Sequence, residues 1–513
     1  MRLCWDLTFA EWALCCYQMA IGAEISVMDV GLSGVEKSFA IDFVERNSNG
    51  LIRLNDAIFY FGELGMQERR SAGLMTELLD QHGFAVTRGI SGFDTSFLAT
   101  YGEGSPVIAI HTEFDANPSN SQKSGVTERA EIVPGAPGHC EGHNTNAAVM
   151  ITAALAVRYA MERFRLPGTL KIFGASAEEQ LLSRPYFVRD GLFDDVDIAF
   201  HDHTSDEFKG DYGVIQSAAV SAEFTFQGET AHAAMSPWKG RDALDAVVLM
   251  DMGIAQYREH MRPTMTAHRV ITHGGEQPNV IPSRAACWWY FRDPTAEGAR
   301  GLFERAKRIA QGAAMMTACE VSIDVRAAVW PVRLNQTIAE VIQRNVEAIG
   351  MPHWTEQEHA FARALQAKIG APEIGLRPAT TPLTGPTPQI AASNDCGDVS
   401  WKVPMGRLWF PGNVPHLPFH HWSAGAALAT SIAHKGGIAG AKALAAATID
   451  YFKTPDLVAQ TRSSFTREIG DIAYRPLLPD EQRPPANLNR DLMEKYRPQM
   501  ETHYPADVAA FQV

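Results

Sequence analysis

Residues 139–146, with the sequence His-Cys-Glu-Gly-His-Asn-Thr-Asn, place several metal-binding side chain types close together. His139, Cys140, Glu141 and His143 fall within five positions, directly before an apolar segment with helical character over 147–164. A carboxylate and an imidazole two residues apart, held at the start of a helix, can both reach one metal ion or a metal pair. The alternative is a solvated loop, because short His/Glu combinations also occur there by chance.

Three further groups of metal-capable residues favour the metal site over the solvated loop. Glu178 and Glu179, His201 and His203, and His420 with its neighbour His421 each follow an apolar segment. Chance alone rarely produces four such groups at the ends of apolar segments. The sequence therefore predicts a metal centre assembled from distant parts of the chain.

The adjacent pair Glu178-Glu179 suggests what such a centre could do. Hydrolysis of an amide needs metals that polarise the carbonyl and acidify water, a base that takes the proton, and donors for the oxyanion. Adjacent residues on a loop point different ways, so one carboxylate can bind metal while the other faces the water. The alternative is a solvated acidic pair at a helix N-terminus, but the buried strand before the pair argues against it.

The elements around these groups alternate between strands and helices. Strands are predicted at 107–111, which Glu113 and Asp115 follow, at 169–175 and at 196–200, which ends at His201 and His203. Helical segments lie between them, and such alternation indicates a mostly parallel α/β sheet. Active-site groups gather at the carboxyl ends of such strands. The loop over 116–138 is long enough to suggest a functional role.

The pattern changes near residue 215. Ala222, Phe224 and Phe226 alternate with polar residues, which predicts a half-exposed antiparallel strand. Two helices and three more strands follow in a small α+β unit inserted into the larger domain. The predicted boundaries are an N-terminal extension 1–35, a first catalytic part 36–215, the inserted unit 216–328, a second catalytic part 329–455 and a tail 456–513 with little periodicity.

Composition excludes several classes of protein. The chain has 513 residues, 46% of them hydrophobic and 20% charged, as in ordinary globular proteins. A net charge of -14 without a basic run argues against a nucleic-acid partner. Seven scattered cysteines without disulfide-like or CxxC spacing favour the cytoplasm. The segment 7–20 is fairly apolar, but Asp6 and Glu11 interrupt it, so we expect neither a signal peptide nor a membrane span.

Several motifs give the chain a resemblance to a known family. It resembles the aminobenzoyl-glutamate hydrolase B-type amidohydrolases, within the dinuclear-metal peptidases that include aminoacylases, hippurate hydrolases and auxin-conjugate hydrolases. The resemblance covers about residues 37–455. The matching stretches are 106–115, 142–144, 178–179, 187–197, 226–234, 240–247, 278–282, 397–401 and 431–436.

The resemblance implies a metallo-exopeptidase-like catalytic domain, a lid and dimerisation domain, and two divalent metal ions per chain. The family's metal ligands fall on Glu141, His143, Glu179, His203 and His420. Its general base falls on Glu178, and its lid histidine, which reaches the active site of the partner subunit, falls on His232. Asn279 matches the lid residue that helps hold the substrate.

This chain departs from the family at one ligand. The branch usually carries Cys-Gly-His where Glu141-Gly142-His143 stands here, so a carboxylate replaces a thiolate. A carboxylate is the harder ligand and favours zinc, with manganese or cobalt as alternatives. Because Glu141 keeps the spacing to His143, we expect Cys140 to be only a neighbour of the site.

Other residues near the motifs have predicted supporting roles. Asp115 is expected to orient a ligand imidazole, and His201 to hydrogen-bond to a ligand. Two alternatives stay open for His434, which either binds substrate or has a structural role. His111 is either a functional residue or a hydrogen-bonded histidine of the core.

The function implied is metal-dependent hydrolysis of the amide bond of an N-acyl or N-aroyl amino acid, such as an aminobenzoyl-glutamate-like conjugate, through a metal-activated water and a Glu general base. The alternatives are a dipeptidase or carboxypeptidase on the same scaffold and a catalytically silent partner subunit. The expected partners are a small-molecule amide, a second copy of the chain and a related A-type subunit.

Overall fold

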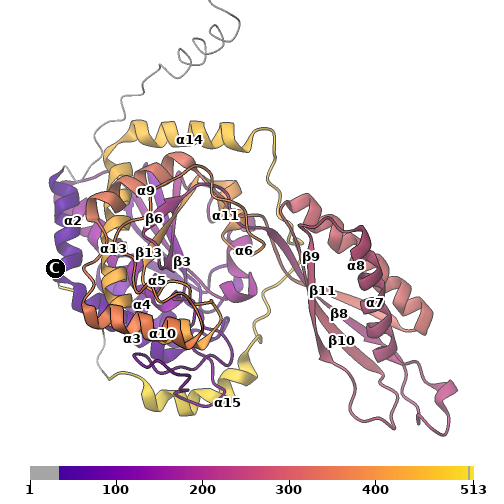
Figure 1. Ribbon diagram of the computed structural model, residues 1–513. Coiled ribbons are helices and arrows are strands. Elements are labelled where there is room, and N and C mark those ends of the chain that lie inside the picture. Colours follow the sequence, from indigo (N-terminus) through magenta and orange to yellow (C-terminus); the bar gives the residue numbers. More distant parts are fainter. Residues whose placement is uncertain (1–33, 507–508, 513) are drawn as a thin grey trace, which may run out of the picture.

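The larger part of the protein is built around a seven-stranded sheet (Figure 1). The computed structural model describes residues 34–506 and 509–512. The strand order is β1-β2-β4-β3-β5-β13-β6, with parallel neighbours among β4, β3, β5 and β13 and antiparallel neighbours toward both edges. The mostly parallel α/β sheet predicted from the sequence is confirmed. The strands are β1 Ala85–Arg88, β2 Phe97–Glu103, β3 Val107–Glu113, β4 Gly168–Ala175, β5 Ile198–Ser205, β6 Lys209–Asp211 and β13 Met405–Pro411.

Helices pack on both faces of this sheet, because its central strands are apolar on both sides. Ile108 and Ile110 of β3 pack against one helical layer, whereas Ala109 packs against the other. The first layer contains α2 Val35–Arg46, α3 Ser48–Phe61, α4 Arg69–Gln81, α5 His143–Phe164, α9 Gln336–Ile349 and α13 Ser431–Lys453. The second contains α6 Ser183–Arg189 and α11 Gly397–Lys402, while α10 Glu356–Lys368 and α12 Trp422–Gly425 lie in a separate small apolar cluster.

The alternation of side chains along the strands decides which polar groups meet. Glu113 of β3 faces the same side as Ala109, and His201 and His203 of β5 face the same side as Ala199. The predicted end of this strand at residue 200 was wrong, because β5 pairs with β13 as far as Ser205. Both histidines therefore lie within the strand. The prediction ended the strand too early because it followed the apolar residues, and these histidines are polar. The helix predicted from residue 147 begins at His143.

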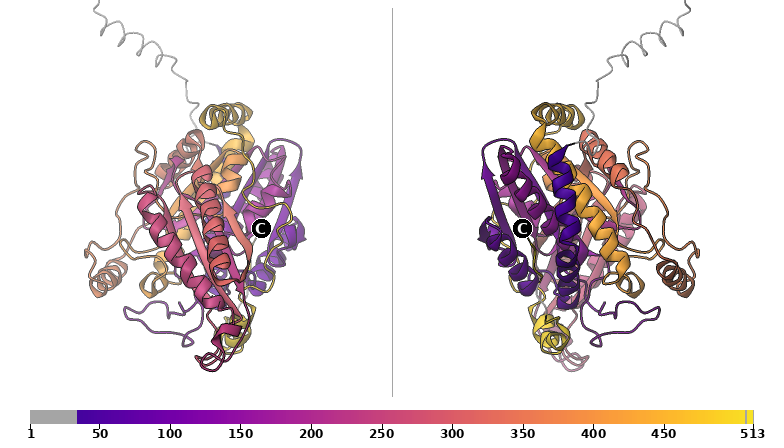
Figure 2. Two further views of the ribbon diagram at one scale, coloured as in Figure 1. Left: turned by 90° about the vertical axis from the view of Figure 1, so that its right-hand side faces the viewer. Right: turned by 90° about the vertical axis from the view of Figure 1, so that its left-hand side faces the viewer.

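A smaller α+β unit projects from the larger one (Figure 1) and faces the viewer in the left view of Figure 2. Its antiparallel sheet has the order β11-β8-β10-β9. α7 Ala243–Tyr257 and α8 Ala296–Thr317 pack together on one face and share its apolar core. Its strands are β8 Ala218–Gln227, β9 Thr266–His273, β10 Arg284–Asp293 and β11 Glu320–Val329, and the pair β7 Gly213–Val214 and β12 Arg333–Leu334 lies near its base.

The segment after residue 455 is more ordered than the sequence indicates. It forms α14 Pro455–Ile469 and α15 Arg490–Met500, and the chain between them passes along both units (Figure 1). The Tyr474 hydroxyl donates to Asp398 Oδ1 at 2.8 Å, and Gln482 Nε2 donates to Asp324 Oδ1 at 3.1 Å. These partners are remote in sequence, so no local pattern of residues predicts the contacts.

The predicted N-terminal extension lies almost entirely outside the described residues, which begin at residue 34. Across the part of the chain that is described, no helix has the combination of length and hydropathy that a membrane crossing requires.

Candidate active site

Two groups of metal-capable side chains meet at His143. Glu113, His143 and His203 form the inner group, and Glu141, His143, Glu178 and Glu179 form the outer group. Within each group the candidate ligand atoms all lie within 4.8 Å of one another. Because His143 belongs to both, the groups are adjacent and could hold a pair of metal ions.

The start of α5 fixes His143. Its Nδ1 lies 3.0 Å from the carbonyl oxygen of Asp115, and its Nε2 lies 3.5 Å from Glu141 Oε2. Gly142, which precedes it, has φ +100°, and a Cβ there would lie 2.5 Å from side-chain atoms of Thr204. Only glycine fits this turn without strain or displacement of its neighbour. Burial by itself would lower the pKa of His143, but Asp115 and Glu141 raise it well above its ordinary value.

His420 closes the outer group from a distant loop. Its Nε2 lies 3.3 Å from Glu141 Oε1 and 3.3 Å from Glu179 Oε2. These carboxylates raise the pKa of His420 to about 10. Burial, followed by the charge of Glu141, raises the pKa of Glu179 to about 7. The surplus of carboxylates over cationic groups makes the outer group suited to a cation.

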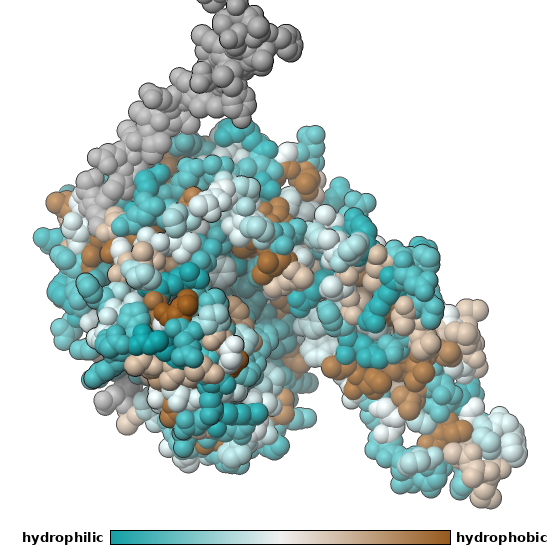
Figure 3. All heavy atoms as spheres, in the orientation of Figure 1, coloured by the Kyte–Doolittle hydropathy of each residue, from teal (hydrophilic) through white to brown (hydrophobic). Residues whose placement is uncertain are grey.

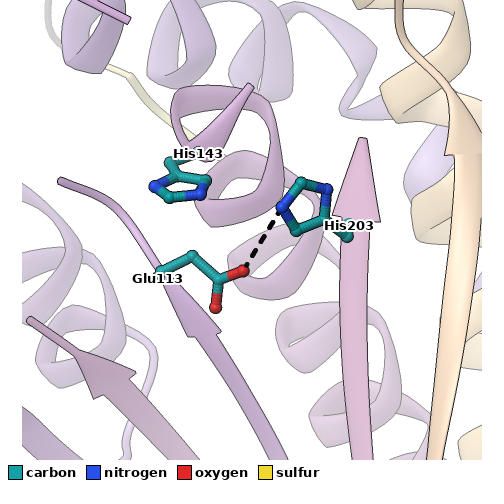
Figure 4. A group of neighbouring side chains, drawn as sticks. All are labelled: Glu113, His143 and His203. Carbon is teal, nitrogen blue, oxygen red and sulfur yellow. Dashed lines mark ion pairs between the residues drawn. The ribbon is translucent and has the colours of Figure 1, made fainter. Parts of the chain in front are cut away.

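Glu113 belongs to the inner group, although it is not among the ligands predicted from the sequence. Its Oε1 lies 3.7 Å from His203 Nε2, and His143 faces the same space (Figure 4). Burial alone would raise its pKa, but His201 and Arg184 hold the pKa of Glu113 well below its usual range. The sequence feature that could have identified Glu113 as a candidate ligand is its position at the carboxyl end of the buried strand β3.

A buried hydrogen-bond network supports the inner group. His201 Nε2 lies 2.9 Å from Glu113 Oε2, and Arg407 Nε donates to His201 Nδ1 at 2.8 Å. Because Nδ1 accepts, His201 is the tautomer that donates from Nε2. Arg184 pairs with both Glu113 and Asp395 and donates from Nε to His111 Nδ1 at 3.1 Å. The sequence did not identify either arginine, because each is an isolated charge in an apolar segment.

Glu178 lies beside both groups and is only 5% exposed. Its Oε2 is 3.8 Å from His143 Nε2. Burial, followed by the charge of Glu113, raises its pKa well above the ordinary value for a carboxyl. Its environment therefore favours the protonated form, as a group that takes up a proton from water requires.

Of the remaining predicted residues, Asp115 contacts the candidate ligands, whereas Cys140 and His434 do not belong to either metal-capable group. Asp115 Oδ2 accepts from the Glu179 backbone N–H at 3.0 Å, so Asp115 contacts two candidate ligands. Cys140 is buried and donates to Asn117 Oδ1 at 3.0 Å, outside both groups. His434 Nε2 lies 2.7 Å from Asp56 Oδ1 on α3, and His434 does not line the cavity that lies beside Glu178.

His232 and Asn279 lie on the smaller unit, away from the metal-capable groups of their own chain. The Ala233 backbone N–H donates to the Asn279 carbonyl oxygen at 3.1 Å, which holds the two segments together. Both residues are exposed. Neither of them lines the cavity beside Glu178.

That cavity has a volume of about 340 Å³ and lies between the two units. One part is acidic and includes Glu141, Glu178 and Glu179. Tyr290 and Arg292 reach it from the smaller unit, and its other lining residues are Leu181, His203, Gln216, Ile390, Ala392, Ser393, Asn394, Arg407, Trp409, Phe419 and His420.

Two buried atoms lack the partners that such atoms normally have. His143 Nε2 and Glu179 Oε1 make no hydrogen bond in the described part of the chain, although buried polar atoms are usually paired. Both belong to the outer group, and both are ordinary ligand atoms for zinc. The residues present therefore fit a metal site. Together with the mostly parallel sheet and the projecting α+β unit, they define a metal-dependent amidohydrolase of the exopeptidase type.

Comparison with known proteins agrees with this class. Residues 215–315 match the family model described as a peptidase dimerisation domain. The chain is 31% identical over 472 residues to the B-type subunit of p-aminobenzoyl-glutamate hydrolase from Escherichia coli (strain K12), covering 87% of this chain and 98% of that one. It is 28% identical over 442 residues to Xaa-Arg dipeptidase of Mus musculus, covering 84% of this chain and 92% of that one.

A solved structure has the same fold. It is a dinuclear metal binding peptidase of the M20 family from Bacillus subtilis, with a TM-score of 0.52, 18% identity and coverage of 80% of this chain and 99% of that one. The chain belongs to the family of B-type p-aminobenzoyl-glutamate hydrolases within the M20 peptidases.

Proposed function

We propose that this protein hydrolyses the amide bond between an acyl or aroyl group and an amino acid, with two divalent metal ions held by Glu141, His143, Glu179, His203 and His420. The observation that carries the proposal is that two adjacent metal-capable groups share His143 beside the buried Glu178. Glu113 is added as a further candidate ligand on the inner side. The chemistry of the E. coli relative, as its name describes it, supports the same reaction.

The reaction needs one group that moves a proton twice. The bound metals would polarise the substrate carbonyl and acidify water. Glu178 accepts the proton of the attacking water and then passes it to the leaving amine, so one carboxyl serves both half-steps. Its raised pKa suits a group that takes up a proton during the reaction. Asp115 holds the His143 ring through Nδ1, which leaves Nε2 facing Glu141, where it would be free to bind a metal.

The donor set favours a particular range of metals. It consists of carboxylates and imidazoles, and the nearby thiol of Cys140 faces Asn117 instead. Such oxygen and nitrogen donors suit zinc, manganese or cobalt. Zinc is the first metal to test.

The smaller unit is proposed to form a homodimer in which His232 and Asn279 complete the active site of the partner subunit. Hydrophobic side chains gather on this unit (Figure 3), including the exposed Val248 and Met252 of α7 and Val270 and Ile271 of the edge strand β9. Exposed apolar groups beside an open strand edge fit association with a second copy. A related A-type subunit is the alternative partner, since the E. coli relative is named as a B-type one.

A dipeptidase is the second candidate function, because the chain is also similar to Xaa-Arg dipeptidase. A silent partner subunit is less favoured, because Glu178 and all the candidate ligands are present. The cytoplasm is the proposed location, and the four described cysteines are all free.

A substrate screen tests the proposal. The purified protein, loaded in turn with zinc, manganese or cobalt, is given N-aroyl amino acids, N-acyl amino acids and dipeptides, and release of the amino acid is measured. Metal-dependent release from the acyl or aroyl conjugates is expected. Release from dipeptides alone would favour the second function, and no release with any metal would refute both.

A further inference from the structure

Arg407 is a buried cation without a carboxylate partner among the described residues. Its side chain is 1% exposed on β13, and it lines the cavity beside Glu178. Its guanidinium donates to His201 Nδ1 at 2.8 Å, to Gln216 Oε1 at 3.1 Å and to Cys396 Sγ at 3.0 Å. None of the three acceptors is a carboxylate, because they are an imidazole nitrogen, a side-chain amide oxygen and a cysteine sulfur.

Arg184 provides the contrast within the same network. It is equally buried, but its guanidinium pairs with the carboxylates of Glu113 and Asp395. Buried charges in proteins are usually paired in this way, because removing a charge from water is costly. Arg407 has two N–H groups beyond those it uses, since a guanidinium carries five. We therefore expect a negatively charged group of a molecule bound in the cavity to pair with Arg407.

A second guanidinium lines the same cavity. Arg292 of β10 donates from one terminal nitrogen to the Ala391 carbonyl oxygen at 3.2 Å, and its buried Nε makes no hydrogen bond in the described residues. It too has no ion pair with any described carboxylate. The segments that carry these contacts adjoin, because Gln216 pairs with Ile390. The cavity thus offers two unpaired guanidinium groups besides its acidic, metal-capable groups.

We propose that Arg407 is a specificity-determining residue that binds the side-chain carboxylate of an acidic amino acid in the substrate. This inference rests on the proposed function, because it concerns the amino-acid side of the amide. Every amino-acid product carries one α-carboxylate, which can pair with one guanidinium. A second unpaired guanidinium is satisfied only by a second carboxylate, as in glutamate or aspartate. A basic side chain at the same place would be repelled, which separates this substrate class from that named for the Xaa-Arg dipeptidase relative.

The test compares conjugates that differ only in this charge. The ratio of kcat/KM for an N-acyl-glutamate to that for the matching N-acyl-glutamine is measured for the wild type, Arg407→Gln and Arg407→Lys. A hydrogen bond to a charged group contributes about 1.5–3 kcal/mol, so Arg407→Gln should lower the ratio about 10- to 100-fold. Arg407→Lys keeps the charge and should lower it less. A purely structural role would reduce both activities equally and leave the ratio unchanged.

The matched control is Arg333→Gln. Arg333 stacks over Trp401, pairs with Glu468 at 3.4 Å and does not line the cavity, so its loss should leave the ratio unchanged. If Arg407→Gln fails to fold, product inhibition of the wild type decides instead. Free glutamate should then inhibit at least about tenfold more tightly than free glutamine.

Two results overturn the inference alone: a wild type that does not prefer the glutamate conjugate, or a ratio unchanged in Arg407→Gln. A protein that hydrolyses no conjugate with any metal would refute the proposed function itself.

Discussion

The Nδ1 atom of His143 lies 3.0 Å from the backbone oxygen of Asp115 and 3.2 Å from its Oδ1. The other carboxylate oxygen of Asp115 accepts from the backbone N–H of Glu179 at 3.0 Å. One side chain thus positions two candidate ligands that lie 36 residues apart in the sequence. Groups that hold a ligand in this way commonly affect metal affinity as strongly as some ligands do.

Asp115→Ala should therefore weaken metal binding about 10- to 100-fold, because the His143 ring loses its hydrogen-bond partner. The measurement is a zinc titration in competition with a chromophoric chelator. Asp94→Ala is the control, since Asp94 is exposed. Equal zinc affinity in Asp115→Ala and the wild type would show that Asp115 does not position the ligands.

The neighbouring residues Cys140 and Glu141 should respond oppositely to substitution. Cys140 is buried against Asn117, and burial raises the pKa of its thiol, so a metal-binding thiolate is disfavoured there. Cys140→Ser should keep its full metal content, whereas Glu141→Ala should lose metal. Elemental analysis of both proteins after gel filtration distinguishes them. The reverse pattern would place the ligand one residue earlier.

Two inactive variants should restore activity when they are mixed, if His232 serves the partner subunit. A heterodimer of His232→Ala and Glu178→Ala has one intact site, and random mixing makes half of the dimers heterodimers. The expected recovery is about a quarter of the wild-type rate after subunit exchange. Each variant incubated alone is the control. Absence of recovery in samples whose mass spectra contain heterodimers would contradict the shared site.

Asp398 should make stability depend on pH. It is fully buried, accepts from the Trp330 backbone N–H at 3.0 Å and from the Tyr474 hydroxyl at 2.8 Å, and burial raises its pKa to about 7. The folded protein therefore holds this proton at a pH where the unfolded chain has released it. Stability falls as pH rises from about 4 to about 7, by on the order of 4 kcal/mol for this group.

Asp398→Asn removes the titration, so the stability of the wild type relative to the variant should decline across that pH window. Melting temperatures of both proteins, measured at unit intervals from about pH 4 to about pH 8, test this. Asp94→Asn should run parallel to the wild type, since that residue is exposed. Parallel curves for Asp398→Asn and the wild type would contradict the prediction.

The central strands β3, β4 and β5 could be predicted because each contains a continuous apolar run, and all seven residues of β3 are buried. The outer metal-capable group could also be recognised from the sequence, because Glu178 and Glu179 follow an apolar segment and His143 precedes one. The end of β5 could not be predicted, since His201 and His203 are polar, and the buried partners of His201, Glu113 and Arg407, are remote in sequence.

Long-range partners explain most of what the sequence did not reveal. Arg184 and Asp395 are 211 residues apart, and Arg407 and His201 are 206 apart. Nothing local to either arginine predicts a buried position. Likewise, Tyr474 contacts Asp398 and Trp330, which lie in distant parts of the sequence. The folded sheet and the connections across it must exist before these contacts can be recognised.

Glu178→Gln tests the central claim most directly. The substitution keeps the size and burial of the side chain but removes the group proposed to carry the proton. The measurement is kcat on an N-aroyl amino acid with metal content determined on the same sample. General acid–base groups contribute about 10²–10⁴ in rate, so both metals should be retained while kcat falls at least about a hundredfold. A variant that binds both metals and keeps a near-normal kcat would contradict the account.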